Sequence, residues 1–279
     1  MKIKKTAAMA VVLVMLITAA ACAPSVPSTA PALTPAVTSE TTPIPTETST
    51  PSTAPSATAA VVPSATTAEP TAAPAPLTVD DNPLIYNSDY VDVQISCPEI
   101  SGMQDAAAQT GINDGVYNYL LNMAHSVEDA SKRDAKGSGK HGAYKIDSEF
   151  SVKRNDGRVL SVKIDITKYE GGANDAMDAA FVNVINGKKV TQPTLEELFK
   201  GEFDYEAILN EKVSELIAAD PEGDIYSFNA ISSDQWYYLT NSSLVLVFPS
   251  YSIAPGAYGL PEFAIPFADI SRYLIKEIQ

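Results

Sequence analysis

The stretch Ser242–Asp269, SSLVLVFPSYSIAPGAYGLPEFAIPFAD, decides the fold of the C-terminal part of the chain. Leu244–Phe248 is a run of five apolar residues, which is typical of a strand buried on both faces. Pro249 ends this run because proline has no backbone donor. The residues that follow alternate small, aromatic, proline and glycine types, as loops do. Phe263–Phe267 predicts another strand, and Pro266 near its end favours a position at a sheet edge.

The segment 80–190 is expected to form the N-terminal half of the folded part. Its apolar residues alternate with polar ones in several stretches, which indicates half-buried strands of an antiparallel sheet. Between the first two strands, apolar residues at helical spacing predict an amphipathic helix that becomes regular near Ile112, after Gly111. The expected elements are strands at Tyr90–Cys97, 144–153, 160–166 and Ala180–Ile185, the helix at Asp105–Ala130, a flexible loop at Lys136–Gly142 and tight turns at Asn155-Asp156-Gly157 and Asn186-Gly187.

The segment 191–279 is expected to form the C-terminal half. Its pattern predicts a short helix that begins after Pro193-Thr194, an amphipathic helix, a hairpin and a closing helix. The expected bounds are Ile208–Ile217 for the second main helix, Asp220–Gly223 for its end, Trp236–Thr240 and Leu244–Phe248 for the hairpin, and Ile270–Ile278 for the closing helix. The predicted class is therefore α+β, with antiparallel sheets packed by two main helices and a short C-terminal helix.

These patterns carry a family resemblance. The loop with Tyr251, Ile253-Ala254-Pro255 and Tyr258-Gly259 resembles the C-terminal signature of a domain of unknown function in bacterial cell-envelope proteins. Its carriers include the lysozyme-binding ectodomain of RsiV-type anti-sigma factors and the N-terminal region of PdaC-type peptidoglycan deacetylases. The likeness runs from about Asp89 to Ile270. Where the family has Gly-Gly-Ala-His, this chain ends the motif with Asn174, so the role that the histidine has in the family does not transfer to this chain.

The N-terminal 79 residues read as a targeting segment and a linker. Residues 1–21 have a basic start and an apolar stretch shorter than the ~20 residues that span a bilayer, as in a secretory signal peptide. Cys22 follows Ala19-Ala20-Ala21, which resembles a bacterial lipobox and predicts lipidation of Cys22; ordinary cleavage after an Ala-x-Ala site is the alternative. Residues 22–79 contain 12 of the 20 prolines and no aromatic or basic residue, so we expect a disordered stalk or tether.

Charge narrows the choice of partners. Three lysines and three glutamates offset one another in residues 1–79, so the whole net charge of −15 lies in residues 80–279. Nucleic acids and anionic lipid surfaces need basic patches and are therefore not expected as direct partners. A basic protein partner is compatible with this charge, and solubility alone is an equally good explanation.

The sequence offers little that suggests catalysis. Cys97 is the only cysteine after Cys22 and is in phase with buried strand positions, so we expect a small buried hydrophobe. His125 is expected near the end of the first helix and His141 in a solvated loop, and they do not form a zinc-binding spacing. The three carboxylates of Asp220–Asp224 lack the spacing of a calcium loop. We therefore expect no metal, no cofactor and no catalytic residues.

Aromatic residues are the better candidates for a binding site. Tyr251, Tyr258 and Gly259 lie in the loop after the buried strand, and Trp236 begins the predicted hairpin. Tyrosine and tryptophan are suited to protein interfaces and to stacking on sugar rings. The alternative is that these rings only stabilise a sheet edge.

We expect a lipid-anchored, extracytoplasmic and non-catalytic binding module of a Gram-positive-type bacterium. The resemblance implies lysozyme or cell-wall glycan as its ligand, and the acidic charge agrees with the former. No deacetylase domain and no sigma-factor-binding segment is recognised, so neither activity is expected. The alternatives are an enzyme that acts on peptidoglycan through unrecognised carboxylates, and a structural spacer.

Overall fold

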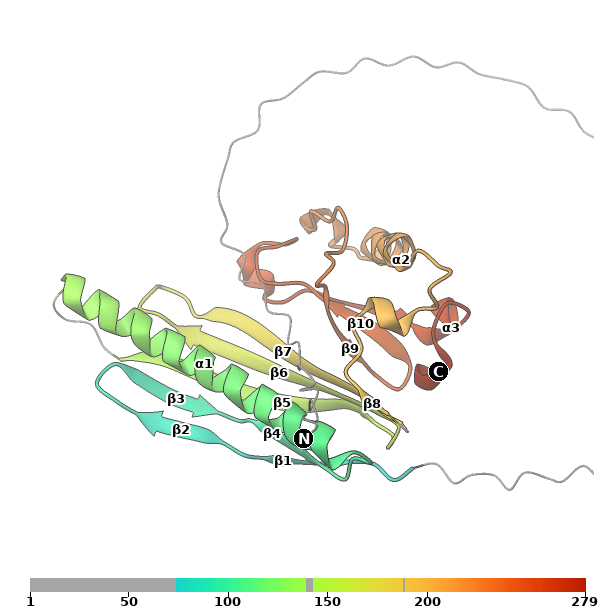
Figure 1. Cartoon of the computed structure of the whole chain (residues 1–279). Coiled ribbons are helices and arrows are strands. Elements are labelled where there is room, and N and C mark those ends of the chain that lie inside the picture. The colour runs from blue at the N-terminus through green and yellow to red at the C-terminus, as the bar shows by residue number, and fades with distance from the viewer. Residues whose placement is uncertain (1–73, 139–142, 188) are drawn as a thin grey trace, which may run out of the picture. The chain divides into compact units, whose positions relative to one another are not determined.

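The computed structural model describes residues 74–138, 143–187 and 189–279, and these lie in one compact unit. The predicted α+β class is confirmed (Figure 1). The expected signal peptide, the linker up to residue 73, Cys22 and His141 lie outside the described residues. Within the described ranges, no helix has the length and apolar character needed to cross a membrane.

A six-stranded sheet forms the larger part of the fold. Its order is β2-β3-β5-β6-β7-β8, and α1, Ala106–Ser138, packs along one face (Figure 1). All neighbours pair antiparallel except β3 and β5, which run parallel because α1 forms the crossover between them. The strands are β2 Leu84–Asn87, β3 Val91–Ile95, β5 Tyr144–Asn155, β6 Val159–Tyr169, β7 Ala176–Asn186 and β8 Val190–Thr191.

The first hydrophobic core lies between this sheet and α1. Alternate residues of β6, such as Val162 and Ile164, pack against Leu120 and neighbouring residues of α1. Val152, which we expected on the same packed face, is 42% exposed. Val152 stands directly before a shift of the β5–β6 register, which lies between Val152 and Arg154 and interrupts the regular alternation of the strand.

The folded part begins earlier than expected. Leu77 is buried in the first core, and its backbone N–H and carbonyl oxygen both bond to the side chain of Asn155, at 2.9 and 2.6 Å. The next four residues, Thr78–Asp81, form β1, which pairs with β4, Pro98–Ser101. The linker boundary at residue 79 was therefore too late, because a single buried leucine ties the end of the low-complexity segment to the fold.

The first helix extends further at its C-terminal end than the predicted Asp105–Ala130, and it is regular from its start rather than from Ile112. Asp105 caps it by accepting hydrogen bonds from Ala107 N and Ala108 N at 2.9 and 3.0 Å, so Gly111 lies inside the helix and does not delay its start. The helix continues to Ser138, so the first residues of the expected Lys136–Gly142 loop are helical and 139–142 lie outside the described residues. His125 is therefore an exposed mid-helix residue and not a helix end.

The C-terminal half contains a second core around a three-stranded sheet. Its order is β11-β10-β9, with β9 Trp236–Leu239, β10 Ser243–Val247 and β11 Glu262–Pro266. The central strand β10 is buried on both faces and β11 lies at the edge, as predicted. Helix α2, Tyr205–Ala219, is capped by Asp204 and packs Leu209 and Val213 into this core.

A polar joint connects the two halves. Ser161 of β6 is fully buried; its Oγ donates to Asn183 Oδ1 at 2.6 Å and accepts from Leu239 N at 2.9 Å. Asn183 in turn donates to Tyr237 O at 3.0 Å. Two side chains of the six-stranded sheet thus bind the backbone of β9, and this part of β6 is covered on both faces rather than on one.

The expected closing helix is replaced by two short turns. Helix α3 covers only Phe267–Ile270, and a 3-10 turn covers Lys276–Ile278. The buried residues Ile270, Leu274 and Ile278 have helical spacing, but the backbone between them bonds elsewhere. Tyr273 O accepts from Lys200 N at 2.8 Å and Ile275 N donates to Leu198 O at 2.9 Å. Tertiary hydrogen bonds therefore take the groups that a continuous helix would use internally.

Candidate functional site

A cleft of about 500 Å³ lies where the β6–β7 turn meets the loop after β10. The turn contributes Asn174 and Asp175, the start of β7 contributes Met177, and the loop contributes Ser250, Tyr251 and Ala257. The structure thus brings together the variant family motif at Asn174 and the tyrosine loop, which are more than 70 residues apart in the sequence. Asp175 and Met177 were not predicted as site residues. The only sequence feature that pointed to them is an apolar methionine directly after a polar turn.

Tyr251 is the most unusual residue of the cleft. It is 76% exposed and has a φ of 64°, and it is the only non-glycine residue with positive φ among the described residues. Such a conformation costs of order 1–3 kcal/mol for a bulky residue and is a recognised mark of functional loops. The prediction that Tyr251 is available to a ligand is compatible with this geometry.

The loop around Tyr251 is firmly held. Ile253 and Ala254 are each 7% exposed, and Ile253 O accepts a hydrogen bond from Ser227 N at 2.7 Å. Ser252 bonds back to Pro249 O through both its N–H, at 3.1 Å, and its hydroxyl, at 2.6 Å. Buried neighbours and local hydrogen bonds therefore fix the backbone that carries the exposed ring, which lowers the entropy lost when a ligand binds.

Two glycines shape the cleft. A Cβ on Gly256 would lie only 2.0–2.4 Å from atoms of the Tyr251 ring, so this glycine makes room for the ring. Gly259 has a φ of 65°, and a Cβ there would approach Met177 Sδ at 3.3 Å. Gly259 thus lets the loop pass close to Met177 at the start of β7, and it lies next to the cleft without being part of its lining.

The other two predicted residues lie apart from the cleft lining. Tyr258 ends the 3-10 turn Gly256–Tyr258 beside the cleft and is 44% exposed. Trp236 packs against Phe181 of β7, with ring centroids 5.9 Å apart, and is half-buried. Trp236 therefore has the sheet-packing role that we gave as its alternative.

The remaining candidates for chemistry lie outside this cleft. Burial, reinforced by Asp81 and Glu99, raises the pKa of the Cys97 thiol to about 11, so at neutral pH it is a protonated core residue. Asp220 ends α2, and the described residues contain no group of three or more His, Cys, Asp or Glu side chains that could hold a metal ion. The cleft itself offers one carboxylate, one aromatic ring and amide and hydroxyl groups, which is a set suited to binding.

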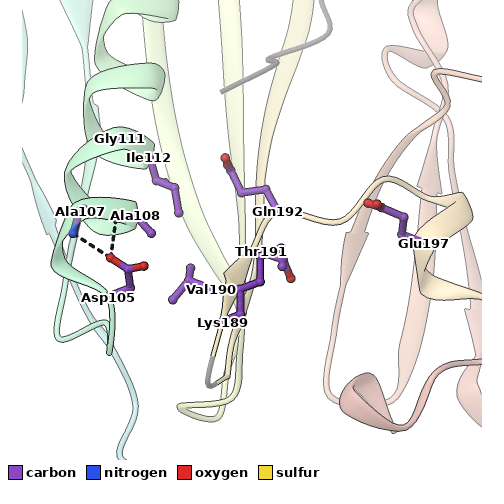
Figure 2. Close-up of a pocket in the computed structure, with 10 residues that line it drawn as sticks. All are labelled: Asp105, Ala107, Ala108, Gly111, Ile112, Lys189, Val190, Thr191, Gln192 and Glu197. Carbon is purple, nitrogen blue, oxygen red and sulfur yellow. Dashed lines mark hydrogen bonds between the residues drawn. The ribbon is translucent and has the colours of Figure 1, made fainter. Parts of the chain in front are cut away.

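A second cleft of about 410 Å³ lies between the start of α1 and β8 (Figure 2). Its apolar lining comes from residues such as Ile112 and Val190, and Gly111 faces it from α1. The two carboxylates near this cleft, those of Asp105 and Glu197, already accept hydrogen bonds from neighbouring backbone N–H groups. Asp105 caps α1, as the dashed lines in Figure 2 show, and Glu197 accepts from Thr194 N at 2.8 Å. None of the predicted site residues lies here.

Two family models match this chain, one in each half of the fold. Residues 85–175 match the family model described as Deacetylase PdaC, and residues 196–268 match the model described as a protein of unknown function, DUF3298. The cleft lies where the two matches meet, because Asn174 and Asp175 end the first and Tyr251 belongs to the second.

One sequence relative and two solved structures support the same assignment. The chain is 26% identical over 200 residues to the anti-sigma-V factor RsiV of Bacillus subtilis (strain 168), which covers 68% of this chain and 67% of RsiV. DUF3298-family structures from Bacteroides fragilis NCTC 9343 and Pseudomonas aeruginosa PAO1 share the fold. Each has a TM-score of 0.52 and 17% identity; they cover 72% and 74% of this chain, and the matches span 94% and 96% of those chains.

Proposed function

We propose that this chain, which belongs to the DUF3298/PdaC-type domain family, is an extracytoplasmic binding module of the bacterial cell envelope that recognises its ligand and does not transform it. The single observation that carries the proposal is Tyr251, an exposed ring in a strained conformation, held by buried anchors at the junction of the two family matches. An aromatic ring that is fixed before binding gives large contact area at a low entropy cost.

The ligand that we favour is a basic protein of the lysozyme type. The relative RsiV is an anti-sigma factor of the same domain family, and the sequence resemblance implies lysozyme binding. The net charge of −15 supports a basic protein over an anionic polymer. Cell-wall glycan, which would stack on Tyr251 and Tyr258, is the second candidate. The module would be attached to the outer face of the membrane of a Gram-positive-type cell through acyl chains on Cys22.

The binding proposal is tested with the full chain and hen egg-white lysozyme. We expect measurable affinity for the wild type and a loss of at least about tenfold for Tyr251→Asn, because a central aromatic anchor contributes more than 1 kcal/mol. Asparagine accepts positive φ, so the fold is preserved and the loss reports on the ring. The matched control is Tyr90→Asn, an exposed tyrosine that is not part of the cleft lining. Equal binding by wild type and Tyr251→Asn contradicts this use of the cleft.

A second variant checks the position of the ring without removing it. In Gly256→Ala the added methyl group overlaps the Tyr251 ring, which is exposed and can swing away. We expect a melting temperature close to that of the wild type, a shift in tyrosine fluorescence and weaker binding. If lysozyme fails to bind at any salt concentration, the same variants are tested by pull-down on purified peptidoglycan, which addresses the glycan candidate.

The non-catalytic proposal and the anchor have separate tests. Incubation with peptidoglycan is expected to release neither reducing ends nor free amines above background. Product formation that disappears in Asp175→Asn would establish an enzyme instead. Cys22→Ala is expected to release the protein from the membrane fraction into the medium, and an unmodified Cys22 in the membrane-bound wild type contradicts lipidation.

A further inference from the structure

The face of the six-stranded sheet that points away from α1 is only partly covered. Around Ser161 and Asn183 it is buried under β9. Beyond this part, the side chains on the same face are exposed or half-buried. We call this area the open face and define it by its polar residues, which are Asp92, Gln94, Lys145, Asp147, Glu149 and Asp165.

One row of paired residues crosses the open face to the cleft. Ile85 of the edge strand β2 lies opposite Gln94, and Gln94 lies opposite Asp147. On the other side of Asp147 the row continues through Thr167 to Met177. Ile85 is 70% exposed and Met177 is 51% exposed, and Met177 also lines the cleft with Tyr251. The open face and the cleft are therefore one continuous surface with an exposed apolar side chain at each end.

The charges of the open face are unbalanced. It carries four carboxylates and one exposed lysine, Lys145. Glu149 lies directly opposite Asp165, and like charges in this position destabilise a sheet. Burial raises the pKa of Asp147, and repulsion from Asp92 and Asp175 raises it further. Lys163 pairs with Asp165, with Nζ 2.5 Å from Oδ1. Among the described residues, Asp92, Asp147 and Glu149 have no salt bridge within 4 Å, so the fold leaves these three carboxylates unpaired.

We infer that the open face is a docking surface for a cationic protein. The positively charged surface of that protein lies across the sheet, and an adjoining part of it binds in the cleft. Charge complementarity selects this occupant. The described residues contain no cluster that could hold a metal ion, nucleic acids and anionic lipids carry the same sign of charge, and a second copy of this acidic chain would be repelled. The inference deepens the proposed function, because the adjoining cleft is the site proposed above to hold the ligand.

The first test does not depend on lysozyme. The full-length 15N-labelled chain is titrated with hexalysine at low salt and followed by amide chemical shifts. We expect the largest changes at Gln94, Asp147 and Glu149, and none at α2, which also carries three glutamates. Ion pairing across an exposed surface is screened within a Debye length of ~8–10 Å at 0.10–0.15 M salt, so the changes should decrease as salt is added. Changes centred on α2, or none at low salt, overturn the inference.

The second test measures association with lysozyme. The variant Asp147→Asn/Glu149→Gln removes two negative charges from the open face, and Glu202→Gln/Glu211→Gln removes two exposed charges near and on α2. We expect the first to lower the association rate several-fold at low salt and to flatten its salt dependence, with a nearly unchanged dissociation rate. The second variant should behave like the wild type, because it changes the net charge equally but not the open face.

The outcomes separate the two proposals. If Tyr251→Asn loses binding but the two charge variants associate equally fast, the cleft holds the ligand and the docking inference fails. If hexalysine maps to the open face but lysozyme does not bind, the docking surface stands and lysozyme is removed as the ligand. Equal slowing by both charge variants shows an effect of net charge only and also overturns the inference.

Discussion

The face of the six-stranded sheet that points away from α1 has two halves, which differ in how their charged groups are paired. In the half covered by β9, Lys163 is 8% exposed and its Nζ lies 2.5 Å from Asp165 Oδ1 and 2.7 Å from Glu262 Oε1. In the open half, Lys145 is exposed, and Asp147 and Glu149 have no salt bridge within 4 Å among the described residues. The buried lysine is thus paired with carboxylates, whereas the open half holds carboxylates that have no salt bridge. This difference indicates that the charges of the open half bind a partner rather than stabilise the fold.

The two lysines provide the strongest test of this difference. Burial opposes the charge of Lys163, but hydrogen bonds to Asp165 and Glu262 outweigh it and keep its pKa above the usual value. Lys163→Met removes a buried cation from two carboxylates that are themselves partly exposed, and Glu262 keeps the hydroxyl of Tyr238 as a donor. We therefore expect a loss of about 3 kcal/mol in the free energy of unfolding, at the low end for a buried ion pair. Lys145→Met on the open face should change it by less than about 0.5 kcal/mol. Denaturant titration measures both; similar losses would remove the distinction.

The polar joint gives a smaller effect of the same kind. Asn183→Leu removes the acceptor of the Ser161 hydroxyl and the donor to Tyr237 O, so two buried groups lose a partner. We expect a total loss of about 1–3 kcal/mol, with the higher values reached only if no water enters. The control is Thr167→Val, a half-buried position on the open face, where the change should stay within about 0.5 kcal/mol. Thermal unfolding that is equal for both variants argues against the joint as a stabilising link.

The smallest expected effect is a gain in stability. Because the folded-state pKa of Asp147 is raised, chiefly by burial, its ionised form disfavours the fold at neutral pH. Asp147→Asn should therefore raise the melting temperature by a degree or so at pH 7. The gain should disappear as the pH falls through the folded-state pKa and below the ordinary value of 3.8, where the aspartic acid is neutral in both states. A variant that is less stable at pH 7 contradicts the view of the open face as internally unfavourable.

Much of the fold could be predicted because its signals are local. The apolar run at Leu244–Phe248, the edge strand with Pro266, the Asn155–Gly157 turn and helix α2 follow from spacing and turn chemistry. The failures came where tertiary contacts decide. Leu77 is held in the fold by hydrogen bonds to Asn155, which is 78 residues away. The segment Ile270–Ile278 does not form a continuous helix because its backbone bonds to Leu198 and Lys200. Neither partner can be read from the local pattern.

The candidate site was predicted only in part for the same reason. The tyrosine loop was found through its aromatic and Pro/Gly composition and through a family resemblance. That Asn174 and Met177 lie across a cleft from Tyr251 depends on how β7 meets the second half of the fold, which no local pattern contains. Trp236 was grouped with the loop because it is aromatic, but its ring packs on Phe181.

The latch between Leu77 and Asn155 has a mechanical consequence. A pull on the N-terminal segment reaches the fold at these two hydrogen bonds and then at the four residue pairs between β1 and β4. The two hydrogen bonds join Leu77 to the end of β5, whereas the β1–β4 pairs form a separate two-stranded ribbon, so both can open while the rest of the six-stranded sheet and the cleft stay intact. Stretching the chain between its N-terminus and a captured partner should therefore produce a weak early rupture, followed by a stronger one that ends recognition.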